Sequence, residues 1–476
     1  MNSIVDRITH TAKDPNKAAT FAVGLFSLGI SLTLVLVWLD LPKLLALLYP
    51  VGATTIGFWL YATQRPLYFG FVWWLWLITP FIRRVVDYLM GNYVAFSLPM
   101  LAPYMVTALV FLDIPRFGAM LKKRTFVPFG FLLVALIYGY LVGIAKVGIL
   151  PATFAFLDWT APVVLGFHVL VSWDLYPKYK RVLQSVLMWG TFFLGLYGLY
   201  QFVSPPPWDA LWMSGSGMSS IGQPNPYEIR VFSMLNAPGP YAMVLMAGLL
   251  LLLDRHGPLT IVSGLFGYVG LLLSLVRGAW GGLVMGLGLI TIGLQGFKRM
   301  RLIALLVVVG VLSIPIVSFE PIEAEVGDRA ETLRDVGEEG SFKARVALYR
   351  TMTVQALSAP IGSGLGSMGW DSGFISVVYK LGWFGALCYF SGMIWLLKEA
   401  WKVRKQVNDS FLVYATSIAA VYFSLQLMGI QTMGVKGVVF WTLISITLAG
   451  KLYSMKTTNS MPPPEKEATT FNLSDH

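Results

Sequence analysis

The sequence predicts an all-α polytopic integral membrane protein with about 14 (12–14) transmembrane helices. Two observations predict this class. Of the 476 residues, 56% are hydrophobic and only 12% are charged, about half the charged share of a soluble domain. The apolar residues also occur in runs of about 20, which is the length that crosses a bilayer as a helix.

The first element is a polar N-terminus, residues 1–20, expected in the cytoplasm. It lacks the apolar core and cleavage site of a secretory signal, so the first span is expected to be retained. The transmembrane domain follows over 21–455, and the Pro- and Glu-containing residues 456–476 are predicted to be a disordered cytoplasmic tail. The predicted spans are 21–39, 44–62, 67–82, 93–112, 125–145, 149–172, 183–203, 234–253, 259–276, 279–295, 302–318, 372–397, 411–429 and 433–450.

Charge sets the expected orientation. Most of the 35 Lys and Arg residues lie in short loops on the same side as the N-terminus, so the positive-inside rule places both termini in the cytoplasm. The net charge of +11 therefore reflects loop bias and does not indicate nucleic-acid binding. The single cysteine, Cys388, excludes an intramolecular disulfide, and with only four histidines we predict no metal and no cofactor.

Arg277 interrupts about forty otherwise apolar residues, between the spans 259–276 and 279–295, which form a tight hairpin or a broken helix. An arginine at membrane depth costs roughly 2.5–3.5 kcal/mol, so it usually faces a partner, a water-filled cavity or a substrate. Arg277 therefore predicts an anionic ligand. The alternative is a short outer turn from which the side chain reaches the lipid headgroups.

Two long loops are expected on the outer side, 204–233 and 319–371, and loops of this length are usually functional or disordered. The first loop carries Glu228 and Arg230 and leads into Asn236-Ala-Pro-Gly-Pro240, a run expected to break or kink the helix that starts near Met234. Arg230 is either a ligand-binding residue or an interfacial anchor.

The second loop begins acidic and then becomes basic. Ser341 is expected to cap a helix that carries Arg345 and Arg350 and runs to about Ser358. Salt bridges to the acidic half would explain these arginines equally well. The glycines of 362–366 allow close backbone approach or form an anion-binding nest. Asp371 then opens the next span, as a helix cap or as a catalytic base.

These pieces together resemble the O-antigen ligase and polymerase family of bacterial polysaccharide membrane enzymes. The resemblance covers roughly residues 200–400. The matching segments are Arg230-Val-Phe-Ser-Met-Leu-Asn-Ala-Pro-Gly-Pro-Tyr-Ala, Ser274-Leu-Val-Arg277-Gly-Ala-Trp-Gly-Gly, Arg345-Val-Ala-Leu-Tyr, Pro360-Ile-Gly-Ser-Gly-Leu-Gly366, Asp371-Ser-Gly-Phe and Leu381-Gly-Trp-Phe-Gly385.

The resemblance implies a GT-C-like helical glycosyltransferase of the bacterial inner membrane, with a large periplasmic loop between residues 319 and 371. Its donor is a glycan on undecaprenyl pyrophosphate, and transfer needs no metal. Arg230, Arg277 and Arg345 are expected to hold the pyrophosphate. The chain departs from the family at one point, because ligases carry a histidine near Asp371. Here His10, His168, His256 and His476 all fall elsewhere in the predicted topology.

Displacement of pyrophosphate builds negative charge that arginines can stabilise, and a carboxylate can accept the proton of the acceptor hydroxyl. The predicted catalytic residues are Asp371, Arg277 and Glu228, and the predicted pyrophosphate-binding residues are Arg230, Arg277, Arg345 and Arg350. Direct attack would invert the anomeric centre.

The leading prediction for the function is a polymerase of exopolysaccharide or O-antigen repeat units, partnered by a flippase and a chain-length regulator. An O-antigen ligase that transfers glycan to lipid A core is the second reading. A transporter of an anion or a lipid-linked glycan is the third, and a non-catalytic scaffold of an export complex is the fourth.

Overall fold

The computed structural model describes residues 41–113, 124–300, 302–303, 340–368 and 372–460. Within these residues the regular structure is helical, and the only β feature is an isolated bridge between Gly222 and Ile229. Eight of the described helices are long and apolar enough to cross a membrane. The predicted all-α membrane architecture is confirmed at this level, whereas the predicted spans 21–39 and, beyond its first two residues, 302–318 lie outside the described residues.

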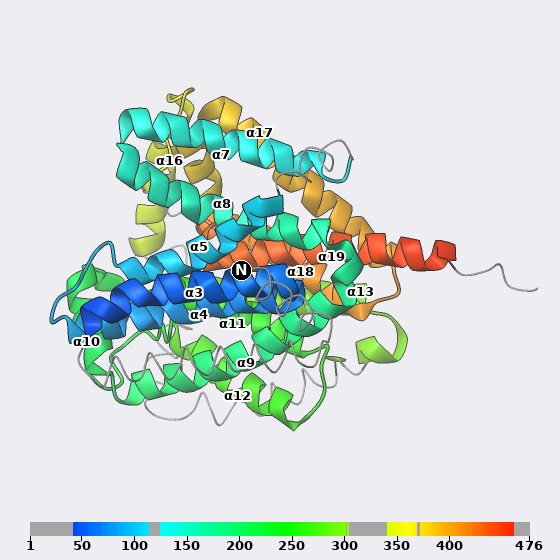
Figure 1. The fold of residues 1–476 in the computed structure, drawn as a ribbon, viewed down its shortest axis with the longest axis horizontal. Coiled ribbons are helices and arrows are strands. Elements are labelled where there is room, and N and C mark those ends of the chain that lie inside the picture. The colour runs from blue at the N-terminus through cyan, green and yellow to red at the C-terminus, as the bar shows by residue number, and fades with distance from the viewer. Residues whose placement is uncertain (1–40, 114–123, 301, 304–339, 369–371, 461–476) are drawn as a thin grey trace, which may run out of the picture.

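Figure 1 shows the arrangement of the helices. The long helices are α3 (Pro42–Thr63), α4 (Arg65–Leu89), α7 (Val127–Lys146), α8 (Ile149–Val171), α9 (Tyr176–Val203), α17 (Gly373–Gln406), α18 (Ser410–Ser424, continued by the 3-10 turn η5, Leu425–Met428) and α19 (Gly434–Ser460). The shorter helices are α5 (Leu101–Ala108, between η1, Leu98–Met100, and η2, Leu109–Asp113), α10 (Pro207–Ser216), α11 (Pro238–Leu252), α12 (Pro258–Leu273), α13 (Arg277–Gly293) and α16 (Gly340–Leu357). Two further 3-10 turns are η3 (Trp173–Leu175) and η4 (Ser219–Ile221).

Several boundaries differ from the sequence-based expectation, among them those of α4, α9 and α17, which extend beyond the predicted spans 67–82, 183–203 and 372–397. The predicted span 93–112 is only a short helical stretch from Leu98 to Asp113, with Pro99 and Pro103 in the first turns of η1 and α5, where proline is tolerated. The Asn-Ala-Pro-Gly-Pro run does not kink a helix that has started at Met234. Instead α11 starts at Pro238, because proline is favoured in the first turn of a helix. Finally, α19 continues to Ser460, beyond the predicted start of the tail at 456.

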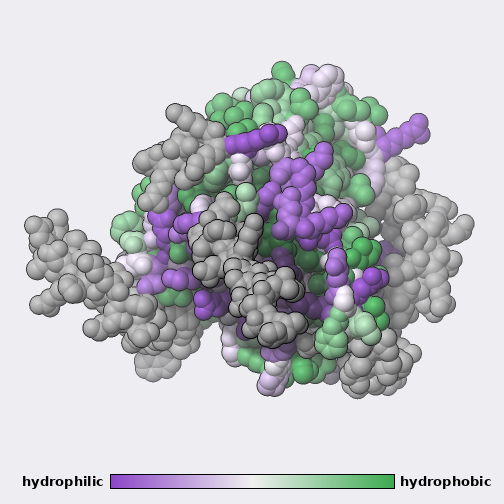
Figure 2. Space-filling view, turned by 90° about the vertical axis from the view of Figure 1, so that its right-hand side faces the viewer, coloured by the Kyte–Doolittle hydropathy of each residue, from purple (hydrophilic) through white to green (hydrophobic). Residues whose placement is uncertain are grey.

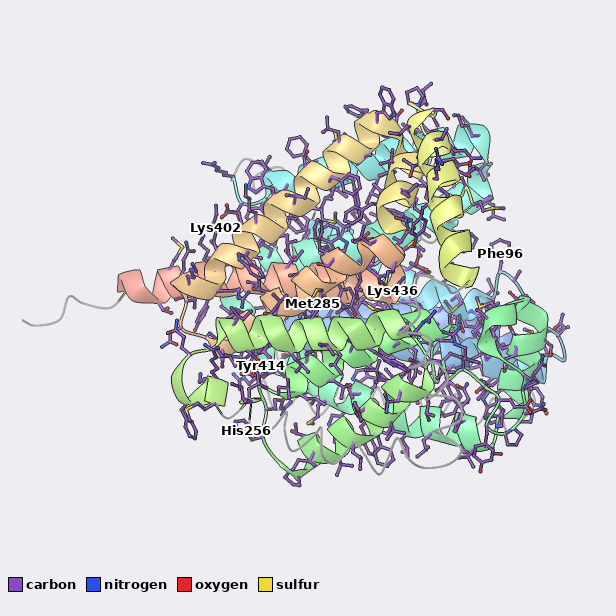
Figure 3. The ribbon with its side chains drawn as sticks, turned by 180° about the vertical axis from the view of Figure 1, so that it is seen from behind. Phe96, His256, Met285, Lys402, Tyr414 and Lys436 are labelled. Atoms are coloured by element: carbon purple, nitrogen blue, oxygen red, sulfur yellow. The ribbon has the colours of Figure 1, made fainter. Side chains whose placement is uncertain are left out.

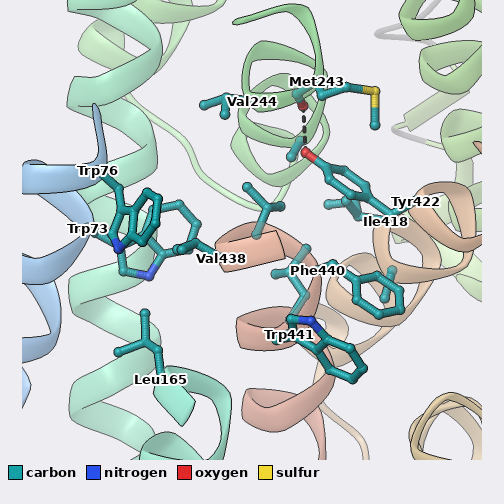
Figure 4. Packing of buried hydrophobic residues seen from close by; sticks show 14 of the residues in the cluster. Trp73, Trp76, Leu165, Met243, Val244, Ile418, Tyr422, Val438, Phe440 and Trp441 are labelled. Carbon is teal, nitrogen blue, oxygen red and sulfur yellow. Dashed lines mark hydrogen bonds between the residues drawn. The ribbon is translucent and has the colours of Figure 1, made fainter. Parts of the chain in front are cut away.

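Close contacts between helices depend on small residues, as is usual in membrane proteins. A Cβ atom on Gly195 of α9 would lie 2.4 Å from the carbonyl of Phe266 in α12. A Cβ atom on Gly166 of α8 would lie 3.0 Å from the carbonyl oxygen of Trp441 in α19. Figure 4 shows the aromatic core around Trp73 and Trp441, where the Tyr422 hydroxyl also donates to the Met243 carbonyl at 2.8 Å.

The bundle has two chemically different ends. His256 and Lys402 lie at one end, together with the last turns of α17 and α19, and Phe96 lies at the other (Figure 3). Figure 2 shows hydrophilic residues gathered on the first of these ends. The loops that precede α11, α13, α17 and α19 lie at the opposite end. Because Glu228 and Arg230 lie on the loop before α11 and Arg277 opens α13, the fold collects these three candidates at one end of the bundle.

Candidate functional site

The segment that carries Glu228 and Arg230 is held by backbone pairing on both sides. The Arg230 amide donates to the Ile221 carbonyl at 3.0 Å, and the Val231 amide donates to the carbonyl of Leu273, the last residue of α12, at 3.1 Å. The loop before α11 is therefore fixed to the turn that leads into α13.

Arg230 and Arg277 belong to adjoining segments. The Arg230 guanidinium donates to the Ser220 carbonyl at 2.9 Å and to the Leu275 carbonyl at 3.3 Å. Leu275 lies two residues before Arg277, which is the half-buried first residue of α13. The hydrogen bonds of Arg230 therefore hold the turn before Arg277.

The backbone of these two segments is strained. Tyr227, Ser233 and Leu275 have φ values of 68°, 51° and 53°, and they are the non-glycine residues with positive φ in the described part of the chain. Such conformations cost about 1–3 kcal/mol each and are concentrated at binding and catalytic sites. All three flank Arg230 or Arg277, which marks this region as the candidate site.

A buried polar network supports the strained segment. Arg84 of α4 forms an ion pair with Asp209 of α10 at 2.8 Å, and both side chains have an exposed fraction of 0%. Arg84 also donates to the Ser233 carbonyl at 2.5 Å. The Gln201 side chain donates to Asp209 at 2.6 Å and accepts the amides of Phe232 and Ser233 at 3.0 and 2.8 Å.

No pattern in the sequence predicted this network. The neighbouring residues Arg83 and Arg84 both have intramolecular partners. Arg83 pairs with Asp87 at 3.3 Å and lies 4.4 Å from the centre of the Trp212 ring. Burial raises the pKa of Asp209, and the neighbouring Arg84 opposes this by favouring the carboxylate. No local sequence signal joins Asp209 to Arg84, since they are far apart in the chain.

Helices α16 and α13 both contact the turn η5. The Tyr349 hydroxyl of α16 donates to the Leu427 carbonyl at 3.4 Å. A Cβ atom on Gly278, next to Arg277, would lie 3.1 Å from the sulfur of Met428. The helix that carries Arg345 and Arg350 therefore adjoins the turn beside Arg277.

The glycine-rich segment 362–366 provides close backbone approach, one of the two roles predicted for it. Helix α17 is interrupted at Gly382 (φ 65°, ψ −175°), and a Cβ atom on Gly362 would lie 2.4 Å from the Gly382 nitrogen. The amides of Ser363 and Gly364 donate to the carbonyls of Tyr379 and Lys380 at 2.7 and 2.9 Å. The segment thus satisfies the backbone groups freed by the break, which is required at membrane depth.

Two lysines hold the same segment from the side. The Lys146 ammonium donates to the Gly362 carbonyl at 2.7 Å. The largely buried Lys380 donates to the carbonyls of Ser367 and Met368, the latter at 3.2 Å. These lysines bind backbone carbonyls and are positioning residues for the segment that leads to Asp371.

The remaining predicted site residues fall into two groups. Glu228 is exposed and accepts a hydrogen bond from the Asn225 side chain at 2.8 Å, and Arg350 is exposed on α16. Arg345 lies within α16, as expected, but its side chain is outside the described residues, and so is Asp371. The helix expected from Ser341 to about Ser358 is confirmed as α16, but it starts at Gly340, so Ser341 lies in its first turn and is not its cap.

Comparison with protein-family models finds no matching family, and comparison with curated proteins finds no match.

Proposed function

We propose that the chain is a membrane glycosyltransferase that joins undecaprenyl-pyrophosphate-linked repeat units into a polysaccharide on the periplasmic side of a bacterial inner membrane. The observation that carries the proposal is the association of Arg230 with the turn before Arg277, on backbone segments with three strained residues. Arginines held this way at a helix N-terminus are suited to bind a pyrophosphate.

In the proposed reaction, a hydroxyl oxygen of the acceptor glycan attacks the anomeric carbon of the donor. The bond from that carbon to the pyrophosphate oxygen breaks, and its electron pair stays on the leaving pyrophosphate. Arg277 and the first amides of α13 stabilise this charge, while Arg230 keeps the turn in place. The hydroxyl proton passes to a carboxylate, and the anomeric centre is inverted.

Asp371 is the proposed base, with Glu228 as the second candidate because it is exposed on the loop of Arg230. Arg345 and Arg350 are proposed to reach the carrier phosphates from α16, which adjoins η5. Among the described residues, Glu228, Arg230 and Arg277 lie at one end of the bundle, which supports an enzyme over a transporter, since transport requires access from both faces.

The test uses the full chain reconstituted in liposomes with an undecaprenyl-pyrophosphate-linked repeat unit and a chelator. Products are resolved by size. We expect a ladder of longer carrier-linked glycans, and Arg277→Ala is expected to lower the rate about 10²–10³-fold, as loss of a charge-stabilising donor does. Arg277→Lys keeps the charge but not the two-pronged geometry and is expected to be intermediate.

Arg299→Ala is the matched control, because it removes an exposed arginine that lies beyond Gly293, the last residue of α13. Full product formation by Arg277→Ala at normal expression would refute the role of Arg277. Transfer only to a lipid A core acceptor would replace the polymerase by a ligase.

A further inference from the structure

A cavity of about 460 Å³ lies at the end of the bundle opposite to the candidate site. It is bounded by the first turns of α9, the junction between α17 and α18, and the last turns of α19. The lining residues include Tyr176, Lys180, Arg181, Asp409 and Tyr453. The lining therefore combines charged and polar groups with apolar surface, and its tyrosines are of the kind that lie at membrane interfaces.

The single carboxylate of the lining is already satisfied. Asp409 accepts hydrogen bonds from the Lys180 ammonium at 2.7 and 2.9 Å, from the Tyr176 hydroxyl at 2.6 Å and from the Phe411 amide at 3.0 Å. Asp409 thus caps α18 and neutralises Lys180, so this pair adds little net charge to the cavity.

Arg181 supplies the remaining charge. It is exposed, its Nε donates to the Pro177 carbonyl at 3.3 Å, and in the described part of the chain it forms no ion pair. The terminal guanidinium nitrogens are the groups that hold an oxyanion in a two-pronged fashion. A nearby second carboxylate, Asp254, is bound by Ser410 and Gln184 at 2.9 and 3.1 Å.

More cations surround the opening. Lys456 of α19 lies 5.4 Å from the centre of the Trp173 ring, and Lys178 is exposed one turn before Arg181. Basic recesses between transmembrane helices at this level of a membrane bind phosphate-bearing headgroups. The volume is also sufficient for a phosphate and its glycerol or sugar substituent.

We propose that this cavity binds a phosphate ester, held by the Arg181 guanidinium and the Tyr453 hydroxyl of its wall, because the hydroxyls of Tyr176 and Thr457 already donate to Asp409 and to backbone carbonyls. The phosphate belongs either to the headgroup of an anionic phospholipid or to a soluble phosphate ester. This site is separate from the proposed transferase site and does not depend on it.

The experiment measures the thermal unfolding midpoint of the full chain in nanodiscs. One arm compares phosphatidylcholine with mixtures that contain phosphatidylglycerol, and a second arm adds glycerol phosphate to pure phosphatidylcholine discs. The variant is Arg181→Gln, which removes an exposed charge. The matched control is Lys405→Gln, an exposed cation at the same end that does not line the cavity.

We expect phosphatidylglycerol to raise the midpoint of the wild type and of Lys405→Gln. In Arg181→Gln the lipid concentration needed for half of this shift is expected to rise about tenfold, the loss of one charge-assisted contact. A shift with the same Arg181 dependence in the glycerol phosphate arm would assign a soluble ligand instead. Equal responses of the two variants, or no response in either arm, would overturn the proposal.

Discussion

Asp209→Asn removes one charge from the buried Arg84–Asp209 pair while preserving its shape. Both side chains are fully buried, so the change leaves the Arg84 guanidinium charged and without its counter-ion at 2.8 Å. Breaking a buried pair in this way costs about 3–5 kcal/mol. We expect a loss of unfolding free energy in this range, because Gln201 and the Ser233 carbonyl do not replace the charge.

The matched control is Glu399→Gln. Glu399 pairs with Lys402 at 2.7 Å, nearly the same distance, but the exposed fractions of these side chains are 35% and 53%. Because exposed pairs are screened by solvent, Glu399→Gln is expected to cost less than about 1 kcal/mol. Because the two ion pairs have nearly equal distances, the difference between their stability losses measures the effect of burial.

The assay is chemical unfolding in detergent followed by tryptophan fluorescence, combined with hydrogen exchange. The double variant Arg84→Met/Asp209→Leu removes both charges and is expected to recover most of the lost stability. In Asp209→Asn the amides of Phe232 and Ser233 should exchange faster, because Gln201 loses its carboxylate partner. A cost equal to that of Glu399→Gln, or a double variant as unstable as Asp209→Asn, would refute the reasoning.

Three further predictions concern packing, backbone and pH. Gly195→Ala should destabilise the α9–α12 contact, because the new Cβ would lie 2.4 Å from backbone, whereas Gly264→Ala in open space should not; thermal unfolding compares them. Gly382→Ala should cost about 1 kcal/mol or more, since its φ is 65° and its Cβ would meet the Pro360 carbonyl at 2.4 Å, and unchanged stability would contradict this. Burial raises the pKa of Asp409, but the bonds from Lys180 and Tyr176 outweigh it and hold that pKa below 3.8. A depressed pKa stabilises the fold above pH 3.8 and loses this effect as the pH falls through the folded value, so the stability gap between wild type and Asp409→Asn should close in acid; a gap constant with pH would contradict this.

Local sequence patterns predicted two elements near the candidate residues. A helix over about 341–358 and the close approach of the 362–366 glycines were both predicted, and both are present, although Ser341 lies inside the helix and is not its cap. The resemblance implied that Arg230 and Arg277 hold one pyrophosphate, which stays a prediction, and the structure shows that Arg230 binds the turn before Arg277. Only the folded structure shows that the Arg230 guanidinium binds backbone carbonyls.

The sequence by itself determined that the chain is a bundle of apolar helices, because hydrophobic runs of membrane-spanning length and the scarcity of charge are properties of contiguous residues. The positive-inside rule also predicted that the basic loops lie on the opposite side of the membrane from the loops that carry Glu228, Arg230 and Arg277. Only the tertiary structure decided that Arg84 is bound to Asp209 and that Gly382 breaks α17 against the glycine segment. These contacts join residues that are distant in the chain, and their energies depend on burial and on the backbone of a neighbouring segment, neither of which a local pattern records.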